Sequence, residues 1–251
     1  MPRTCSPLRY PGGKSNLFKL VRSILRENNI GRGHYAEPFA GGAGLALMLL
    51  YSGEVSEIHL NDLDPAIAAF WRAVLTDTEA LIDKIHLTDV TVEERANQRQ
   101  IYLGKQPADE LELGFSAFFL NRVNRSGIIR TGGVIGSLKQ NGRYLVDCRF
   151  NKEVLINRIR RVAKYKRRIQ FTALDAKDFL KNIDETLPRR SLIYADPPYY
   201  NKGAELYTSS FRPTDHLAFR DRLRSLSAPW MLTYDNCPEI EQLYTGFEQS
   251  P

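Results

Sequence analysis

The chain has 251 residues, of which 43% are hydrophobic and 25% charged, and these values are typical of globular proteins and argue against intrinsic disorder. No apolar run approaches the roughly 18 residues that a membrane-spanning helix needs, and the first residues do not resemble a secretory signal. We therefore expect a cytoplasmic protein without a membrane span.

The first predicted elements alternate between strand and helix. Residues 34–39 read as a short strand that runs into a glycine turn and then a buried helix at 45–50. A second strand at 56–60 ends at Asn61 and Asp62, and a helix follows from Pro65. This order is typical of the start of an α/β fold.

The middle of the chain interrupts that order. Residues 76–113 are helical and charged, and a hydrophobic helical run then leads into a glycine-rich basic stretch. Strands return at 168–172, 191–195 and 230–234, with helical segments around 179–183 and 216–226 between them. The sequence predicts an α/β domain with five parallel strands, formed by residues 1–75 and 165–251. Residues 76–164 form a mainly helical insertion.

Positive charge is concentrated in one segment. Residues 115–168 hold fourteen Lys and Arg against two acidic residues, a net charge of +12, whereas the rest of the chain carries −6. The whole chain has a net charge of +6 and a pI near 9.2. Polar residues interleaved with the basic ones suit phosphate and base contacts, so we predict a nucleic-acid partner. The alternative for residues 158–168 is a solvated basic helix face.

The glycine turn predicts a nucleotide-like ligand. Gly41, Gly42 and Gly44 follow the first strand, where a ligand can approach backbone N–H groups at a helix N-terminus. Asp62 lies 20 residues beyond Gly42, which suits hydrogen bonds to ribose hydroxyls. Glu37 would repel a pyrophosphate but suits a cationic group, and this favours S-adenosyl-L-methionine (AdoMet) over NAD. The alternative is a purely structural turn.

A Gly-Lys-Ser sequence at 13–15 is shared with nucleotide-binding P-loops, but Leu8 stands where the first glycine of that motif is required. We therefore expect Lys14 to meet a carboxylate.

The most specific element is Asp196-Pro197-Pro198-Tyr199, directly after an apolar strand. The two prolines end the strand and leave carbonyl groups facing a cleft. Methylation of an exocyclic amino group requires acceptors for both of its N–H protons, and Asp196 and the Pro197 carbonyl can supply them. Tyr199 can stack on the base. The alternative is a proline-terminated strand with a structural aspartate.

Four motifs in this order resemble the DNA adenine methylase (Dam) family, the alpha group of N6-adenine methyltransferases. They are Arg9 to Lys14, Glu37 to Gly44, Asn61-Asp62 and Asp196 to Tyr199, and the resemblance spans nearly the whole chain. It implies a Rossmann-like, AdoMet-dependent domain in which residues 76–164 are the target-recognition insertion. It further implies methyl transfer to adenine N6 in double-stranded DNA by base flipping, and a restriction endonuclease as a partner at the system level.

The resemblance also assigns residues. The expected catalytic residues are Asp196, Pro197, Pro198 and Tyr199. The expected cofactor-binding residues are Tyr10, Lys14, Glu37, Pro38, Phe39, Gly41, Gly44, Asp62, Asp178 and Phe179, the last two at the cofactor adenine. The expected DNA-binding residues, in a hairpin and the basic stretch after it, are Arg122, Asn124, Arg125, Ser126, Arg130, Lys139 and Arg143.

Three alternatives remain beside this interpretation. Cytosine-N4 methylation uses similar chemistry, although Asp196 favours adenine, and the chain could also be an inactive DNA-binding remnant. A cytosine-C5 enzyme would need a nucleophilic cysteine in the cleft, where we expect none.

The three cysteines and four histidines have no metal-ligand spacing, so no metal site is predicted. Compared with the family, the chain ends early and further C-terminal strands are expected to be missing.

Overall fold

The computed structural model describes residues 5–9, 14–200 and 211–249. Within them, five strands form one parallel sheet: β1 (Gly33–Glu37), β2 (Val55–Asn61), β3 (Ile169–Thr172), β4 (Ser191–Ala195) and β5 (Trp230–Leu232). The strands lie in the order β3-β2-β1-β4-β5. The predicted α/β class and the five parallel strands are confirmed, with ends that differ by one or two residues.

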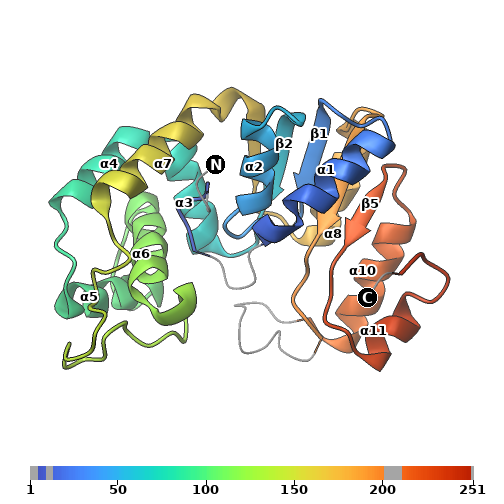
Figure 1. The fold of residues 1–251 in the computed structure, drawn as a ribbon. Helices are drawn as coiled ribbons and strands as arrows, with labels where there is room; N and C mark the ends of the chain where they lie inside the picture. The colour runs from blue at the N-terminus through green and yellow to red at the C-terminus, as the bar shows by residue number, and fades with distance from the viewer. Residues whose placement is uncertain (1–4, 10–13, 201–210, 250–251) are drawn as a thin grey trace.

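Helices cover both faces of this sheet (Figure 1). The first half of the chain contributes α1 (Phe18–Glu27), α2 (Gly44–Tyr51), α3 (Pro65–Thr76), α4 (Thr78–Leu87), α5 (Val92–Tyr102) and α6 (Glu110–Val123). The second half contributes α7 (Lys152–Lys164), α8 (Ala176–Thr186), α10 (Pro213–Arg224) and α11 (Pro238–Leu243). Short 3-10 helices are η1 (Lys14–Leu17), η2 (Arg125–Gly127) and η3 (Lys166–Arg168).

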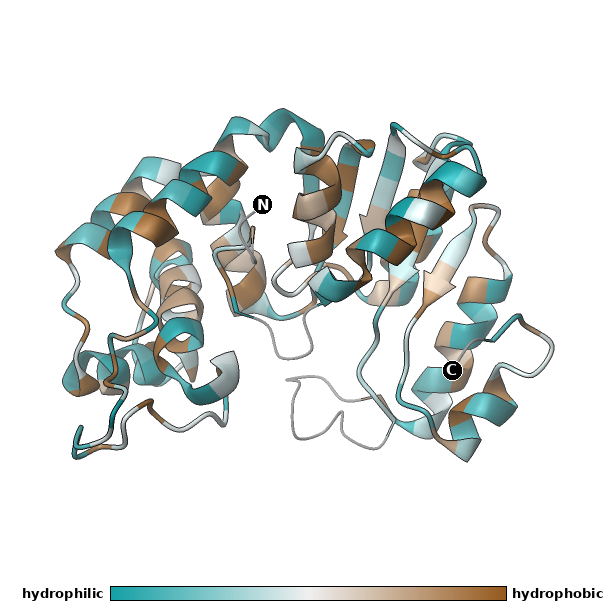
Figure 2. Cartoon of the chain, viewed as in Figure 1, coloured by the Kyte–Doolittle hydropathy of each residue, from teal (hydrophilic) through white to brown (hydrophobic). Residues whose placement is uncertain are grey.

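Local sequence explains where several helices begin. Asp64 caps α3, because its carboxylate accepts hydrogen bonds from the amides of Ala66 and Ile67 at 2.8 and 3.2 Å, and Pro65 occupies the first turn. Asp109 and Glu112 form a reciprocal capping box at the start of α6. α2 has almost no polar face (Figure 2), and five of its eight residues are buried against the sheet.

The core divides into two clusters, one on each face of the sheet. Tyr35 of β1 belongs to a cluster that includes residues of α1 to α4, α6 and α7, whereas the neighbouring Ala36 belongs to a cluster that includes residues of α8, α10 and α11. The first cluster continues into the helical part, where Phe70 of α3 stacks on Phe118 of α6 with ring centroids 5.5 Å apart. The helices α4 to α7 lie together beside α3, at one end of the molecule (Figure 1).

In the described part of the chain, no helix combines the length and the apolar character that crossing a membrane would need.

Candidate active site

The sheet order places a topological switch point between β1 and β4. From β1 the chain adds β2 and β3 on one side, and it later adds β4 and β5 on the other. Ligands of open parallel sheets bind at such a point, outside the carboxyl ends of the strands. A cavity of about 480 Å³ opens there, and Glu37 at the end of β1, Asp62 after β2 and Asp196 after β4 all line it.

The loop between β1 and α2 is fixed to the end of β2. Gly41 has φ +46°, a left-handed conformation that glycine adopts readily. Its amide donates to Asp62 Oδ2 at 2.8 Å, and its carbonyl accepts from Trp71 Nε1 at 2.8 Å. These two hydrogen bonds fix the conformation of the loop. The N-terminus of α2 faces the cavity, which Ala43 and Gly44 line.

Asp62 is held by the backbone rather than by a cation. Besides the Gly41 amide, the Asp64 amide donates to Asp62 Oδ1 at 3.0 Å. Burial raises the pKa of Asp62 to about 6, although the two amide hydrogen bonds oppose that rise. Each carboxylate oxygen can accept more than one hydrogen bond, so both remain suited to ligand hydroxyl groups.

Glu37 is a buried carboxyl group in the wall of the cavity. Tyr35 Oη donates to Glu37 Oε1 at 3.0 Å, and 4% of the Glu37 surface is exposed. Burial raises the pKa of Glu37 to about 8, and the nearby Asp196 charge adds to the rise. At neutral pH a ligand cation would favour the ionised form of this group.

Lys14, Asp196 and Tyr199 form a polar cluster at the cavity, which Lys14 and Asp196 line. Lys14 Nζ lies 3.1 Å from Asp196 Oδ1 and donates to Tyr199 Oη at 2.6 Å. Burial would lower the pKa of Lys14, but its contacts with Tyr199 and Asp196 raise it, so the amine stays cationic. Burial raises the pKa of Asp196, and the Lys14 charge opposes that shift. The expected contact between Lys14 and a carboxylate is confirmed.

A second contact orients Asp196 from the neighbouring strand. Thr233 follows β5, and its hydroxyl donates to Asp196 Oδ1 at 2.8 Å. Tyr194 Oη lies 2.7 Å from the same Thr233 hydroxyl. The Thr233 amide donates to the Ala195 carbonyl at 3.0 Å, which holds the end of β5 against β4. Asp196 thus has partners on two elements, η1 and the end of β5.

A comparison with protein-family models matches residues 10–250 to D12 class N6 adenine-specific DNA methyltransferases. The chain belongs to this class. A search of curated proteins found no match. The acceptor of the reaction is therefore the N6 amino group of adenine in DNA, which agrees with the acidic residue, two prolines and tyrosine at the switch point.

Most of the residues predicted to bind the cofactor of this methyltransferase surround the cavity. The lining includes Lys14, Glu37, Pro38, Phe39, Gly44 and Asp62. Gly41 is not among the lining residues, but its amide donates a hydrogen bond to Asp62, which is. Tyr10 lies outside the described residues.

The pair predicted at the cofactor adenine lies away from the cavity. Asp178 is exposed on α8, and Phe179 is buried in the core with Leu180. Asp175 and Ala176, one turn earlier, line the cavity instead. The correction follows from the helix start, because Asp175 caps α8 by accepting from the Lys177 amide at 2.9 Å, so residues 178 and 179 are already inside the helix.

Two of the predicted DNA contacts are internal. The Arg122 residue is 8% exposed, and its guanidinium donates to the Arg149 carbonyl at 2.6 and 2.9 Å and to the Pro7 carbonyl. Asn124 is fully buried and bridges Arg95 to the Ile128 carbonyl. Both side chains are held inside the protein by these hydrogen bonds, and their predicted contacts with DNA stay a prediction.

The other predicted DNA contacts are on or near the surface. Arg125, Ser126, Arg130, Lys139 and Arg143 are exposed. An antiparallel bridge between Asn124 and Val134 closes the loop after α6, as in a short hairpin. Ser126 and Arg130 from this loop also line the cavity. The basic loop therefore adjoins the candidate active site.

Cys5 corrects the expectation that the cleft has no cysteine. It lines the cavity but is buried, and burial raises the pKa of its thiol. A protonated thiol is a poor nucleophile, so Cys5 offers no support for cytosine-C5 chemistry.

Thr233 and Asp175 are site residues that the sequence analysis missed. Asp175 could have been found, because it stands between a strand and a helix as Asp62 and Asp64 do. Thr233 has no such signal, since its role depends on the pairing of β4 with β5.

Proposed function

We propose that the methyltransferase binds AdoMet in the cavity at the switch point and transfers its methyl group directly to N6 of an adenine flipped out of duplex DNA. One observation carries the proposal: Asp196 and Pro198 line the same cavity as the acidic side chains of Glu37 and Asp62, and Tyr199 is hydrogen-bonded to Lys14, which also lines it. When bound, AdoMet supplies a methyl group that its positive sulfonium makes electrophilic.

The cavity suits this cofactor in size and charge. Its volume of about 480 Å³ is within the range of small-molecule sites. Asp62 would accept hydrogen bonds from the ribose hydroxyls, and Glu37 would face the cationic amino-acid part. Asp175 would accept a hydrogen bond from the adenine amino group of the cofactor, in place of Asp178.

Asp196 and Pro197 would prepare the target nitrogen. The lone pair of an exocyclic amine is delocalised into the base, so the nitrogen must rehybridise before it attacks. Acceptors for both N–H protons favour that change and stabilise the positive charge that develops on N6. The Asp196 carboxylate and the Pro197 carbonyl would be these acceptors, and Lys14 and Thr233 would fix the carboxylate.

Tyr199 would hold the target base. A base inside the duplex cannot reach the cavity, and flipping it out costs a few kcal/mol that the pocket must offset. Base–aromatic stacking contributes about 1 to 3 kcal/mol. The hydrogen bond from Lys14 to Tyr199 Oη at 2.6 Å would keep the ring in place for stacking.

DNA would approach from the side of the basic loop. Arg125, Lys139 and Arg143 are exposed, and the loop at 126–130 lines the cavity. We assign residues 76–164 to target recognition, and residues 1–75 with 165–251 to the catalytic domain. Phosphate contacts from this segment would position the duplex, and side chains near the cavity would read bases.

The test is nucleoside analysis of plasmid DNA after incubation with the purified protein and AdoMet carrying a labelled methyl group. The account predicts label in N6-methyladenine alone. Label in N4-methylcytosine would overturn the assignment of the base. No transfer by a folded protein that binds the same DNA would support the inactive-remnant alternative instead.

A further inference from the structure

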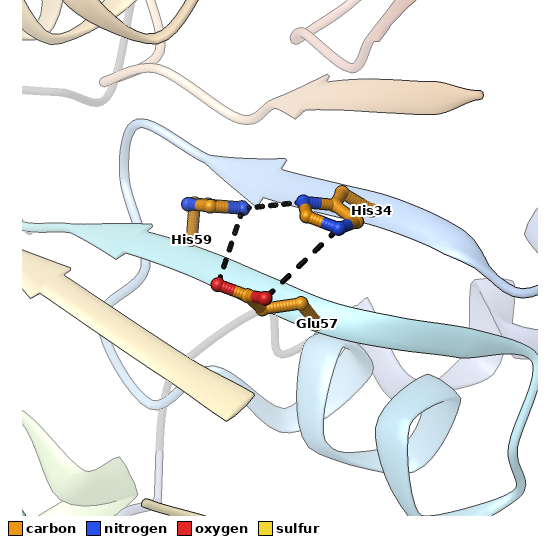
Figure 3. Close-up of side chains that lie close together, drawn as sticks. All are labelled: His34, Glu57 and His59. Atoms are coloured by element: carbon orange, nitrogen blue, oxygen red, sulfur yellow. Dashed lines mark hydrogen bonds and ion pairs between the residues drawn. The ribbon is translucent and has the colours of Figure 1, made fainter. Parts of the chain in front are cut away.

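Three side chains of metal-binding types, two histidines and one glutamate, meet on the sheet and do not line the cavity. His34 is on β1, and Glu57 and His59 are on β2 (Figure 3). The parallel register pairs His34 with Glu57, and His59 with Ala36. Since alternate residues of a strand share a face, all three side chains are on the face that Ala36 shares with α8 and α10.

The spacing of the three groups suits a single ion. His34 Nδ1 lies 3.0 Å from His59 Nε2. Glu57 Oε1 lies 4.0 Å from His59 Nε2, and Glu57 Oε2 lies 3.9 Å from His34 Nε2. Ligand atoms about 2.1 Å from a tetrahedral ion are about 3.4 Å apart. Taking one ligand atom from each side chain, the three atoms lie within 4.8 Å of one another, so side-chain rotations would bring them to a single ion.

The cluster is open to solvent and has the ligand chemistry that a transition metal needs. The side chains of His34 and Glu57 are 25% and 28% exposed, and that of His59 is 13% exposed. Imidazole nitrogens and carboxylate oxygens are common ligands of Zn²⁺. Gln170 on β3 donates to Glu57 Oε1 at 3.2 Å and so helps to orient this carboxylate.

We propose that His34, Glu57 and His59 form a binding site for a divalent transition-metal ion such as Zn²⁺. Two imidazoles and one carboxylate leave a fourth position for water. The site would join β1 to β2 near the start of β1. Three residues of strand, about 10 Å, separate His34 from Glu37, and none of the three ligands lines the cavity. The ion would therefore stabilise the sheet and take no part in methyl transfer.

The experiment is calorimetric titration of the full-length, chelator-treated protein with Zn²⁺. Cys148 is exposed and could bind zinc on its own, so the titration is done in a Cys148→Ser background. We expect one ion per chain. The His34→Ala and His59→Ala variants should each lose more than about a hundredfold in affinity, because a direct ligand matters more than the supporting groups whose loss costs 10- to 100-fold. The exposed His86 offers the matched control, His86→Ala, which should bind normally.

Thermal unfolding provides a second readout. Because the ion binds the folded state, Zn²⁺ should raise the unfolding temperature of the parent protein and of His86→Ala, but not of His34→Ala or His59→Ala. Glu57→Gln keeps the shape of the side chain and should still weaken binding if either alanine variant fails to fold. The proposal is overturned if binding disappears with the Cys148→Ser change, or if Zn²⁺ affinity is the same in the parent, the histidine variants and Glu57→Gln.

Discussion

The orientation of the Asp196 carboxylate depends on Thr233, a residue outside the Asp-Pro-Pro-Tyr motif. The Thr233 hydroxyl reaches the same carboxylate oxygen that Lys14 contacts, and it also meets Tyr194. A charge-assisted hydrogen bond of this kind contributes about 1.5 to 3 kcal/mol. The orientation of Asp196 toward a target amine therefore rests partly on Thr233.

Replacing Thr233 tests this arrangement. Thr233→Val keeps the shape but removes the hydroxyl, so we expect kcat to fall by about 10- to 100-fold with little change in the KM for AdoMet. Thr233→Ser should restore most of the rate, because it keeps the hydroxyl. Steady-state kinetics on duplex DNA measure both values. An unchanged kcat in Thr233→Val would show that Asp196 needs no support from β5.

Glu37 should release a proton when AdoMet binds. Its pKa of about 8 leaves it mostly protonated at pH 7 in the ligand-free protein, and a bound cation would favour the carboxylate. Calorimetry of AdoMet binding at pH 7, in buffers with different ionisation enthalpies, measures that proton. The release should be absent in Glu37→Gln. Equal proton release by the two proteins would remove Glu37 from the cofactor site.

The same group makes the ligand-free protein sensitive to pH. The folded-state pKa of about 8 lies above the ordinary value of 4.5. Its contribution to stability is therefore complete below about pH 4.5 and is lost as the pH rises through 8. Denaturant unfolding should show the free energy of unfolding of the parent falling relative to Glu37→Gln over this range. A constant difference between the two would contradict the shifted pKa.

At the end of α6 and in the loop after it, a buried basic residue with a structural role stands close in sequence to exposed basic residues. Arg122 is buried and donates to two backbone carbonyls, while Arg125 and Arg130 are exposed on the same loop. Asn121 adds a further link, since its amide group contacts both the backbone of Arg9 and the Gly127 carbonyl. Substitution of Arg122 should therefore affect stability, whereas substitution of Arg125 or Arg130 should mainly affect DNA binding.

Arg122→Ala should destabilise the protein by about 1 to 3 kcal/mol, because carbonyl acceptors are left unpaired. Arg130→Ala should leave stability nearly unchanged, whereas Arg125→Ala removes a hydrogen bond to the Val134 carbonyl and should cost about 0.5 to 1.5 kcal/mol. If each contacts one phosphate, each should flatten the slope of log affinity for DNA against log salt by about 0.9. Urea unfolding and binding titrations at several salt concentrations measure the two effects. A flattened slope in a stable Arg122→Ala protein would contradict its structural role.

The elements that sequence predicted well are those defined by local patterns. Strand β4 was predicted with its observed bounds because an apolar run ends at Asp196 and two prolines. Other features depend on strand pairing or packing, and local sequence does not show them. Arg122 looks like any other arginine of a basic loop until α6 is seen to be buried on nearly every side. His34 and Glu57 are far apart in sequence and meet only because β1 pairs with β2.

At the scale of the whole molecule, one hydrophobic cluster joins the sheet to the helices α4 to α7. Phe118 of α6 is fully buried between Phe70 of α3 and Phe150, with ring centroids 5.5 Å from each. The proposed target-recognition segment thus shares its core with the proposed catalytic domain. We expect the two parts to unfold together.

Phe118→Ala should cost about 3 to 5 kcal/mol of stability, as for other buried phenylalanines. The unfolding should remain a single transition. Leu138 is 73% exposed, and Leu138→Ala should change stability by less than about 0.5 kcal/mol. Denaturant unfolding followed by circular dichroism and by tryptophan fluorescence tests this. Separate transitions for the two signals would contradict a shared core.

In the proposed mechanism Asp196 accepts a hydrogen bond from the target amine, while residues of the basic segment hold the duplex. Single-turnover methyl transfer by Asp196→Ala, measured with the affinity for the same duplex, tests it most directly. We expect the rate to fall by about a hundredfold or more, with duplex binding through the basic segment preserved. Near-normal transfer by the folded variant would contradict the mechanism, and loss of DNA binding in parallel with transfer would make Asp196 a structural residue instead.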